Sequence, residues 1–258
     1  TLKRCPACSY AHLEQGVHLA EVCDRCGTAL DETSKISELV HLRNVSLKLA
    51  QRITCDEEER QFRRLYGHPR GRVAVVSPAG EHAFFAPGQR AGARRALGLD
   101  PDRPTLLFVG RIQPLKGPDV AVQALAQMQR RDAQLVVVGG ASGLAGDGEV
   151  QRLHDMIDRL GVRDRVRFVP PQPHHILSTY YRAADAVVAP SRSESFGLVA
   201  LEASACGVPV VASAVGGLLT LVDHGRTGYL VPDRDPGVFA QHLNHPPYHP
   251  ALPEAMGR

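Results

Sequence analysis

From about residue 72 onward, short apolar runs alternate with longer stretches in which apolar residues recur at helical spacing. The apolar runs, rich in β-branched residues, are at 73–76, 105–109, 134–138, 165–169, 186–189, 208–212 and 229–231. The helical stretches include 118–131, 149–160, 176–183 and 198–205. Strands that alternate with helices predict βαβ units. We therefore expect an α/β fold with a single Rossmann-like, doubly wound parallel sheet, in which ligands bind at the carboxyl ends of the strands.

The N-terminal part of the chain follows a different pattern. Residues 1–32 show no hydrophobic period, and residues 34–61 are polar, with a solvated charge run at 56–60. We expect the second of these segments to be helical in part. The change near residue 58 predicts two domains, 1–57 and 58–258.

Four of the six cysteines form two CxxC pairs, Cys5 with Cys8 and Cys23 with Cys26, with fourteen residues between the pairs. Two such turns can present four thiolates to a tetrahedral Zn²⁺, so we expect a small structural zinc ribbon. Two disulfides or a redox pair are the alternatives. Disulfides suit the expected cytoplasmic setting less well, and a redox pair needs a strand before it and a helix after it. Cys55 is expected to be a free thiol and Cys206 a small buried residue.

Length and charge exclude several classes of protein. The chain has 258 residues, with 30 basic and 27 acidic side chains, so bulk charge gives no argument for nucleic-acid binding. No apolar stretch reaches membrane-spanning length, and the N-terminus lacks the apolar run of a signal peptide. We expect a cytoplasmic protein without a membrane span.

A basic turn follows the apolar run at 105–109. Its sequence, residues 110–117, is Gly-Arg-Ile-Gln-Pro-Leu-Lys-Gly. Gly110 permits a sharp turn, after which Arg111 and Lys116 can converge on one anion, the arginine in a bidentate way and the lysine as a point charge. An isolated turn of this kind more often faces solvent. Together with the next motif, it indicates a diphosphate site.

Two carboxylates, Glu194 and Glu202, bracket the start of a predicted helix at 198–205. Backbone N–H groups at that start could bind phosphate oxygens, and the two carboxylates could accept hydrogen bonds from sugar hydroxyls. Glu194 alone could be a helix-terminal charge and Glu202 a buried, satisfied carboxylate. The intervening Ser195, Phe196 and Gly197, and the basic turn upstream, favour a functional site.

With these two motifs, residues from about 58 to 235 resemble the C-terminal, donor-binding domain of family 4 retaining glycosyltransferases, which have the GT-B fold of two Rossmann domains. The segments 108–119 and 194–202 are most similar to the D-inositol-3-phosphate glycosyltransferases of mycothiol synthesis, and less so to sucrose-phosphate and sucrose synthases. The resemblance implies retaining transfer of a sugar from a UDP-GlcNAc-like donor to a small hydroxyl acceptor such as inositol phosphate.

The resemblance also implies roles for individual residues. Arg111 and Lys116 would hold the donor diphosphate, Glu194 the transferred sugar and Glu202 the ribose hydroxyls. Further donor contacts are implied for Gly110, Gln172, Ser195, Phe196, Gly197 and Leu198, with Gln172 in the loop that borders the uracil. In the mycothiol enzymes Mg²⁺ is associated with the segment that matches 181–184, although the chemistry of this fold does not need it.

The chain departs from the family in its N-terminal part. About 57 residues precede the matched region, where the family has a whole Rossmann domain that carries the acceptor site. We therefore expect the chain to bind donor but to be incomplete as an enzyme alone, and a partner chain could supply the missing domain. Residues 1–57 instead resemble a zinc-binding fragment of DEAD/DEAH-type helicases, which indicates a fusion or junction near residue 58. The alternative function is a zinc-ribbon module that binds nucleic acid or protein, joined to a passive Rossmann domain.

Overall fold

The computed structural model describes residues 2–4, 11–13, 53–67, 75–78, 80–81, 83–142 and 146–244. The chain divides into two compact units. The first comprises residues 1–53 and 59–76, and the second comprises residues 54–58 and 77–258. The predicted domain boundary at 57/58 falls inside residues 54–58, a short segment that belongs to the second unit.

In the first unit, β1 (Leu2–Arg4) pairs antiparallel with β2 (Ala11–Leu13). The helix α2 (Asp56–Tyr66) begins in the second unit and continues in the first. Ile53 forms an isolated parallel bridge with Val75, so this described residue of the apolar run predicted at 73–76 lies in no strand of the large sheet. The four cysteines of the predicted zinc ribbon lie outside the described residues.

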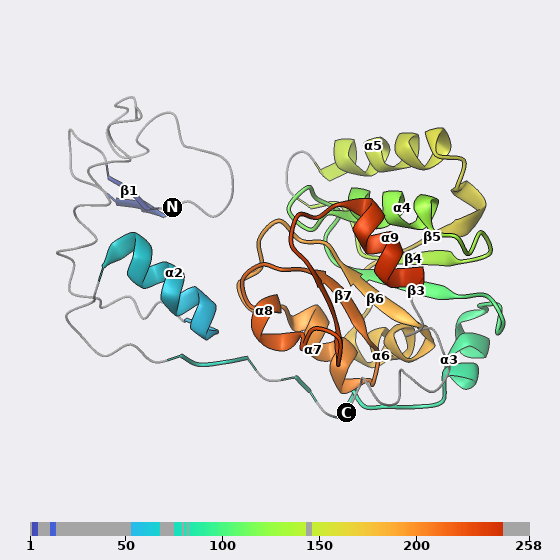
Figure 1. Ribbon diagram of the computed structural model, residues 1–258, viewed down its shortest axis with the longest axis horizontal. Coiled ribbons are helices and arrows are strands. Elements are labelled where there is room, and N and C mark those ends of the chain that lie inside the picture. Colours follow the sequence, from blue (N-terminus) through green and yellow to red (C-terminus); the bar gives the residue numbers. More distant parts are fainter. Residues whose placement is uncertain are drawn as a thin grey trace. The chain divides into compact units, whose positions relative to one another are not determined.

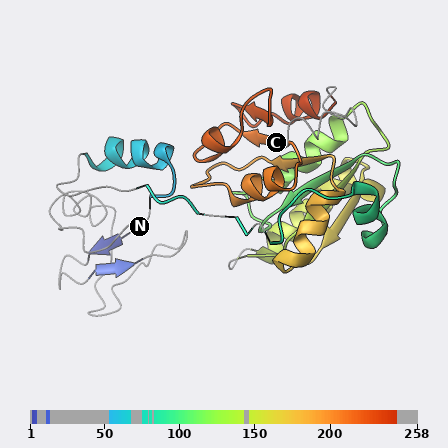
Figure 2. The ribbon, with the colours of Figure 1, turned by 90° about the horizontal axis from the view of Figure 1, so that it is seen from below.

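The second unit is built on a six-stranded sheet in which all neighbouring strands are parallel (Figures 1 and 2). The strand order is β5-β4-β3-β6-β7-β8. The strands are β3 (Thr105–Val109), β4 (Gln134–Val138), β5 (Val166–Val169), β6 (Ala186–Ala189), β7 (Val210–Ser213) and β8 (Gly228–Val231). This arrangement confirms the predicted α/β fold with a parallel sheet.

Helices cover both faces of the sheet, as Figure 1 shows. They are α3 (Arg90–Leu97), α4 (Pro118–Gln127), α5 (Gly146–Arg159), α6 (His174–Ala183), α7 (Leu198–Ala205), α8 (Leu218–Leu221) and α9 (Pro236–Asn244), with a 3₁₀ turn at Arg163–Arg165. Side chains alternate along each strand, so Leu107 packs in a core with α3, α6 and α7. Leu106 and Phe108 pack in a second core with α4, α5 and α9.

The predicted helices agree with the structure except near their ends. The stretch predicted at 118–131 ends at Gln127, because Met128 adopts an extended conformation with ψ 143°. The stretch predicted at 176–183 begins earlier, at His174, directly after Pro173. Within the described residues, no helix is both long and apolar enough to cross a membrane.

The strand order changes direction between β3 and β6. From β3 the chain proceeds through α4 to β4 on one side, whereas β6 lies on the other side of β3 and leads to β7. The helices that follow β3 and β6 pack in different cores, α4 in the second and α7 in the first, so the chain turns to opposite faces of the sheet after these two strands. In open α/β sheets this switch point is where ligands bind.

Candidate functional site at the carboxyl edge of β3 and β6

The basic turn after β3 is fixed by close contacts between backbones. Gly110 has φ 155°, and a Cβ added at Gly139 would lie only 1.9 Å from the Gly110 carbonyl oxygen. The amide of Ile112 donates to the carbonyl of Gly140 at 2.8 Å. The glycine pair after β4 thus lets the β3 loop approach closely, and the Arg111 side chain remains exposed at its surface.

The loop after β6 is held in the same way by a second glycine pair. A Cβ at Gly216 would lie 1.7 Å from the carbonyl oxygen of Glu194, and one at Gly217 would lie 2.0 Å from that of Phe196. The amide of Gly217 donates to the Glu194 carbonyl at 3.1 Å. Gly197, with φ 100°, then caps the start of α7.

These two loops bring Lys116 and Glu194 together. The Nζ atom of Lys116 donates to Oε2 of Glu194 at 2.6 Å, and the Ser191 hydroxyl lies 3.4 Å from the same oxygen. The two charged side chains are 23% and 17% exposed, so solvent still reaches the pair. The loops are also joined by their backbones, since the Arg192 amide donates to the Leu115 carbonyl at 2.8 Å. The sequence predicted both residues of this ion pair but not their direct contact.

Glu202 lies on α7, and its carboxylate contacts α6. The Tyr181 hydroxyl donates to Oε2 of Glu202 at 2.6 Å. Burial raises the pKa of Glu202, while the hydrogen bond from Tyr181 opposes that rise. Burial and the neighbouring Glu202 carboxylate hold the pKa of Tyr181 well above its ordinary value. Glu202 is thus fixed by a buried tyrosine, and among the described residues its second carboxylate oxygen accepts no hydrogen bond.

The remaining predicted site residues line the same edge. Ser195 and Leu198 are exposed, whereas Phe196 and Gly197 are buried in the loop before α7. Gln172 follows β5, and its amide nitrogen donates to the Pro170 carbonyl at 2.9 Å. Among the described residues no hydrogen bond links Gln172 to the ion pair.

The segment from Tyr181 to Ala184, for which Mg²⁺ was expected, contains no carboxylate. Its carbonyl groups at Tyr181 and Ala183 accept hydrogen bonds from the Ala184 amide and from Nε of Arg94. Among the described residues, no group of three or more His, Cys, Asp or Glu side chains is arranged to hold a metal ion. The described residues therefore offer no cluster of such side chains as ligands for the expected Mg²⁺.

Sequence reasoning missed the two glycine pairs, although each follows a predicted strand. Glycine pairs at such positions indicate that another backbone approaches closely. It also missed Tyr181 and Ser191 as partners of the two carboxylates. Nothing in the sequence around those two residues distinguishes them, because their contacts are made across separate elements.

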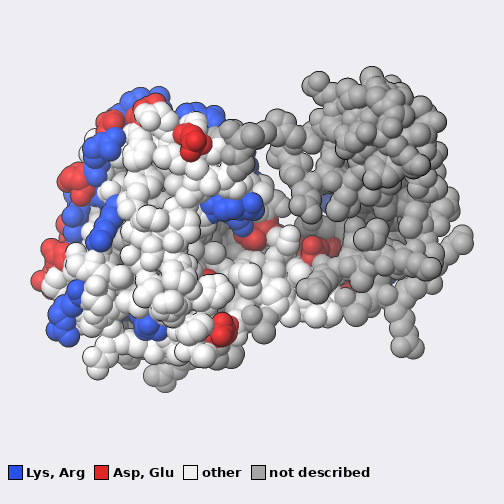
Figure 3. Space-filling view, turned by 180° about the vertical axis from the view of Figure 1, so that it is seen from behind, with Lys and Arg blue, Asp and Glu red and all other residues white. Residues whose placement is uncertain are grey.

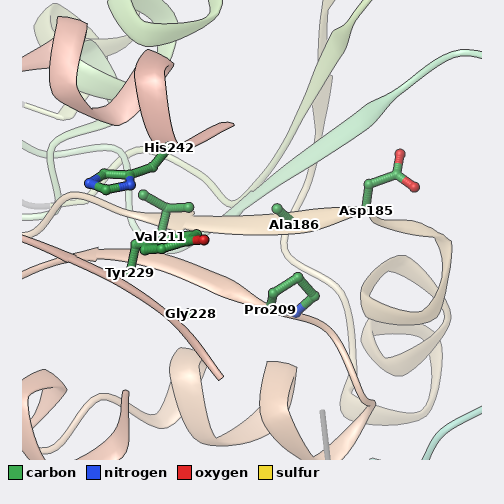
Figure 4. A pocket seen from close by; sticks show the side chains of 7 residues that line it. All are labelled: Asp185, Ala186, Pro209, Val211, Gly228, Tyr229 and His242. Atoms are coloured by element: carbon green, nitrogen blue, oxygen red, sulfur yellow. The ribbon is translucent and has the colours of Figure 1, made fainter. Parts of the chain in front are cut away.

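A cavity of about 230 Å³ lies behind the basic turn. It is lined by Pro114, Pro118, Asp119, Glu149, Arg152, Leu153, Met156 and Arg192. A second cavity, of about 10 Å³, lies at the opposite edge of the sheet among residues near the starts of β6, β7 and β8 (Figure 4). Tyr229 and His242 stack there with ring centroids 4.4 Å apart. That space suits about one water molecule and is remote from both motifs.

The surface of the second unit carries charges of both signs. On the face in Figure 3, Lys and Arg alternate with Asp and Glu along one margin, while the middle is largely uncharged. The described part of this face thus shows no continuous basic stripe of the kind that nucleic-acid-binding proteins present.

Comparisons with solved structures identify the fold. Sucrose-phosphate synthase from Thermosynechococcus elongatus superposes with a TM-score of 0.76 and 36% identity, covering 88% of this chain and 55% of that one. Anabaena Alr3699/HepE, solved in complex with UDP and glucose, gives a TM-score of 0.73 and 25% identity, covering 86% of this chain and 60% of that one.

Comparisons of sequence identify the family. D-inositol 3-phosphate glycosyltransferase 2 of Catenulispora acidiphila is 52% identical over 191 residues, which are 72% of this chain and 44% of the relative. The D-inositol 3-phosphate glycosyltransferase of Kribbella flavida is 49% identical over 208 residues, 79% of this chain and 49% of the relative. The chain thus spans less than half the length of these curated relatives. The model of the family described as glycosyl transferases group 1 matches residues 89–253. The chain therefore belongs to the group 1 glycosyl transferases.

Proposed function

We propose that the second unit is the donor-binding domain of a retaining glycosyltransferase, half of a GT-B fold. The observation that carries the proposal is the Lys116–Glu194 contact of 2.6 Å at the point where the strand order reverses. A cation and a carboxylate held side by side offer the two groups that a nucleotide sugar needs, one for its diphosphate and one for its sugar hydroxyls.

In the proposed complex the donor replaces each partner of the ion pair. The diphosphate accepts hydrogen bonds from Lys116 and, at the edge of the loop, from the exposed Arg111. Sugar hydroxyls then donate to Glu194, so neither half-buried charge is left without a partner. Cations at the diphosphate stabilise the negative charge that develops as the bond to the sugar breaks.

The start of α7 adds a second source of positive potential. The first amides of a helix have no intrahelical acceptor, and the helix dipole favours an anion at that end. Phe196, Gly197 and Leu198 bring this end of the helix next to Glu194 in the chain. Beyond it, the free oxygen of Glu202 is available to the ribose hydroxyls, and Gln172 borders the space proposed for the base.

The relatives suggest the chemical class of the substrates. Two proteins that are about half identical to this chain over the aligned residues are named D-inositol 3-phosphate glycosyltransferases. A structural neighbour was solved with UDP and glucose. We infer a uridine diphosphate sugar such as UDP-N-acetylglucosamine as donor and inositol phosphate as acceptor.

Transfer also requires an acceptor hydroxyl held against the sugar, and positioning of this kind supplies much of the rate. The 258 residues match less than half of each curated relative, so we propose that a further domain or a partner chain completes the site. These residues alone should bind donor without useful turnover.

Calorimetric titration of UDP-N-acetylglucosamine into the 258-residue chain, followed by an assay with inositol phosphate, tests both parts. Saturable donor binding without transfer is the expected result. Absence of donor binding would refute the proposed site, whereas rapid transfer by these residues alone would refute the need for a completing domain.

A further inference from the structure

Arg234 lies in the short connection between β8 and α9, and its side chain contacts the loop that carries Glu194. Its Nε atom donates to the Pro190 carbonyl at 2.8 Å. Pro190 directly follows β6, and Glu194 comes four residues later on the same loop. The guanidinium therefore holds the first residue of the loop that carries Glu194, the carboxylate proposed to bind the sugar.

The same guanidinium packs against the loop that carries Lys116. A Cβ added at Gly117 would lie 2.5 Å from Nη2 of Arg234 and 2.3 Å from the Pro190 carbonyl oxygen. Gly117 has φ 70° and begins α4, directly after Lys116. Only a residue without a side chain fits between these two groups, so the Lys116 loop is seated on Arg234 and Pro190.

Both the backbone conformation of Arg234 and the burial of its guanidinium are energetically unfavourable. Among the described residues it is the one non-glycine with a positive φ, 51°. Its Nη2 atom is buried without a hydrogen-bond partner in the part of the chain that the structure describes. Burial and the neighbouring Arg192 lower the pKa of Arg234, and Asp119 partly offsets that effect. Strain and unsatisfied polar groups persist where the surroundings impose them, and they cluster at functional sites.

We propose that Arg234 is a positioning residue that holds the Lys116 and Glu194 loops in the arrangement needed to bind the donor diphosphate. The inference rests on the proposed function, because it assigns Lys116 to that diphosphate. Arg234 makes no contact with the donor in this account. It acts through Gly117 and Pro190.

A cycle of variants tests this role by calorimetry with UDP. Arg234→Gly accepts the positive φ without strain and removes the side chain. It should weaken UDP binding about fivefold to tenfold, yet by less than about twofold when Lys116 is already alanine. Arg234→Lys keeps the charge and one donor but cannot span both loops, so it should weaken binding only about twofold to threefold, again only when Lys116 is present.

Arg226→Gly is the matched control, because it removes an exposed arginine from another loop of the same unit and should leave UDP affinity unchanged. Unaltered UDP affinity in Arg234→Gly would overturn the inference while leaving the proposed function intact. An equal loss with and without Lys116 would also overturn it, since a general structural or electrostatic role predicts that result. If Arg234→Gly does not fold, Arg234→Lys takes its place in the test. An unaltered UDP affinity, or an equal loss with and without Lys116, would then overturn the inference. A wild-type chain that does not bind UDP would refute the proposed function and this inference together.

Discussion

Nζ of Lys116 lies 2.6 Å from Oε2 of Glu194, so the cation proposed for the diphosphate and the carboxylate proposed for the sugar neutralise each other in the free protein. The pair joins loops from two adjacent strands, β3 and β6. Donor binding must exchange this contact for two new ones. The net gain in free energy is therefore smaller than the sum of the new contacts.

Glu194→Gln should strengthen binding of UDP, which has a diphosphate but no sugar. The substitution frees Lys116 and removes a negative charge beside the phosphates, worth about 0.5–1 kcal/mol for a partly exposed pair. Binding of the complete nucleotide sugar should gain less, because the amide is a poorer acceptor for its hydroxyls. Calorimetry with both ligands measures the difference. Asp102→Asn, an exposed change before β3, is the control, and weaker UDP binding by Glu194→Gln would contradict this account.

Gly216→Ala should damage the site and the fold together. The new Cβ would lie 1.7 Å from the Glu194 carbonyl oxygen, and the φ of 51° at Gly216 adds strain. We expect a loss of stability of at least about 2 kcal/mol by urea unfolding, with weaker UDP binding. Gly148→Ala, in α5 with nothing within 4 Å of its new Cβ, should be neutral or slightly stabilising. Equal stability of the two variants would show that the glycine pair after β7 does not hold the conformation of the loop that carries Glu194.

Stability should depend on pH through Glu202. Burial raises the folded-state pKa of Glu202 above 4.5, so the folded protein binds this proton more tightly than the unfolded chain. The stabilising contribution is complete below the unfolded pKa and is lost as pH rises through the folded value. Glu202→Gln lacks this titration, so wild type should lose stability relative to the variant as pH rises above the unfolded pKa of about 4.3. Urea unfolding of both proteins at pH values below and above that pKa measures the effect, and a constant difference would rule it out.

Zinc content tests the expectation for Cys5, Cys8, Cys23 and Cys26, which lie outside the described residues. We propose that they bind about one equivalent of Zn²⁺. Chelation should release the metal and make four thiols reactive, while the unfolding transition of the α/β unit remains. Replacing Cys5 and Cys8 by serine should abolish zinc binding, whereas Cys206→Ser should not. If the purified protein contains no zinc and all four thiols are titratable, the proposed zinc site is excluded.

Much of the second unit could be predicted from the sequence because local patterns determine it. The runs at 105–109 and 134–138 are strands with those bounds, and the two motifs lie in loops at the carboxyl edge of the sheet, as predicted. The run at 73–76 looks the same in sequence, yet its residue Val75 belongs to the first unit, where it pairs with Ile53. Strand partners depend on the packing of distant segments, which periodicity does not specify.

The contacts that position the site residues could not be predicted either, because they also depend on the packing of distant segments. Glu202 depends on Tyr181 from another helix, and Lys116 depends on Gly117 fitting against Pro190. Each contact joins residues far apart in the chain, and only the folded arrangement brings them within reach. Motifs therefore identified the chemical groups, whereas tertiary packing determines how they are held.

Calorimetric titration of UDP and of uridine into wild type and Lys116→Ala tests the central claim most directly. Removing a charge-assisted contact to the diphosphate should cost about 1.5–3 kcal/mol of UDP binding and leave the weak binding of uridine unchanged. Arg226→Ala removes an exposed positive charge elsewhere in the same unit and should match wild type with both ligands. Equal affinity of wild type and Lys116→Ala for UDP would contradict the assignment of this loop to the donor diphosphate.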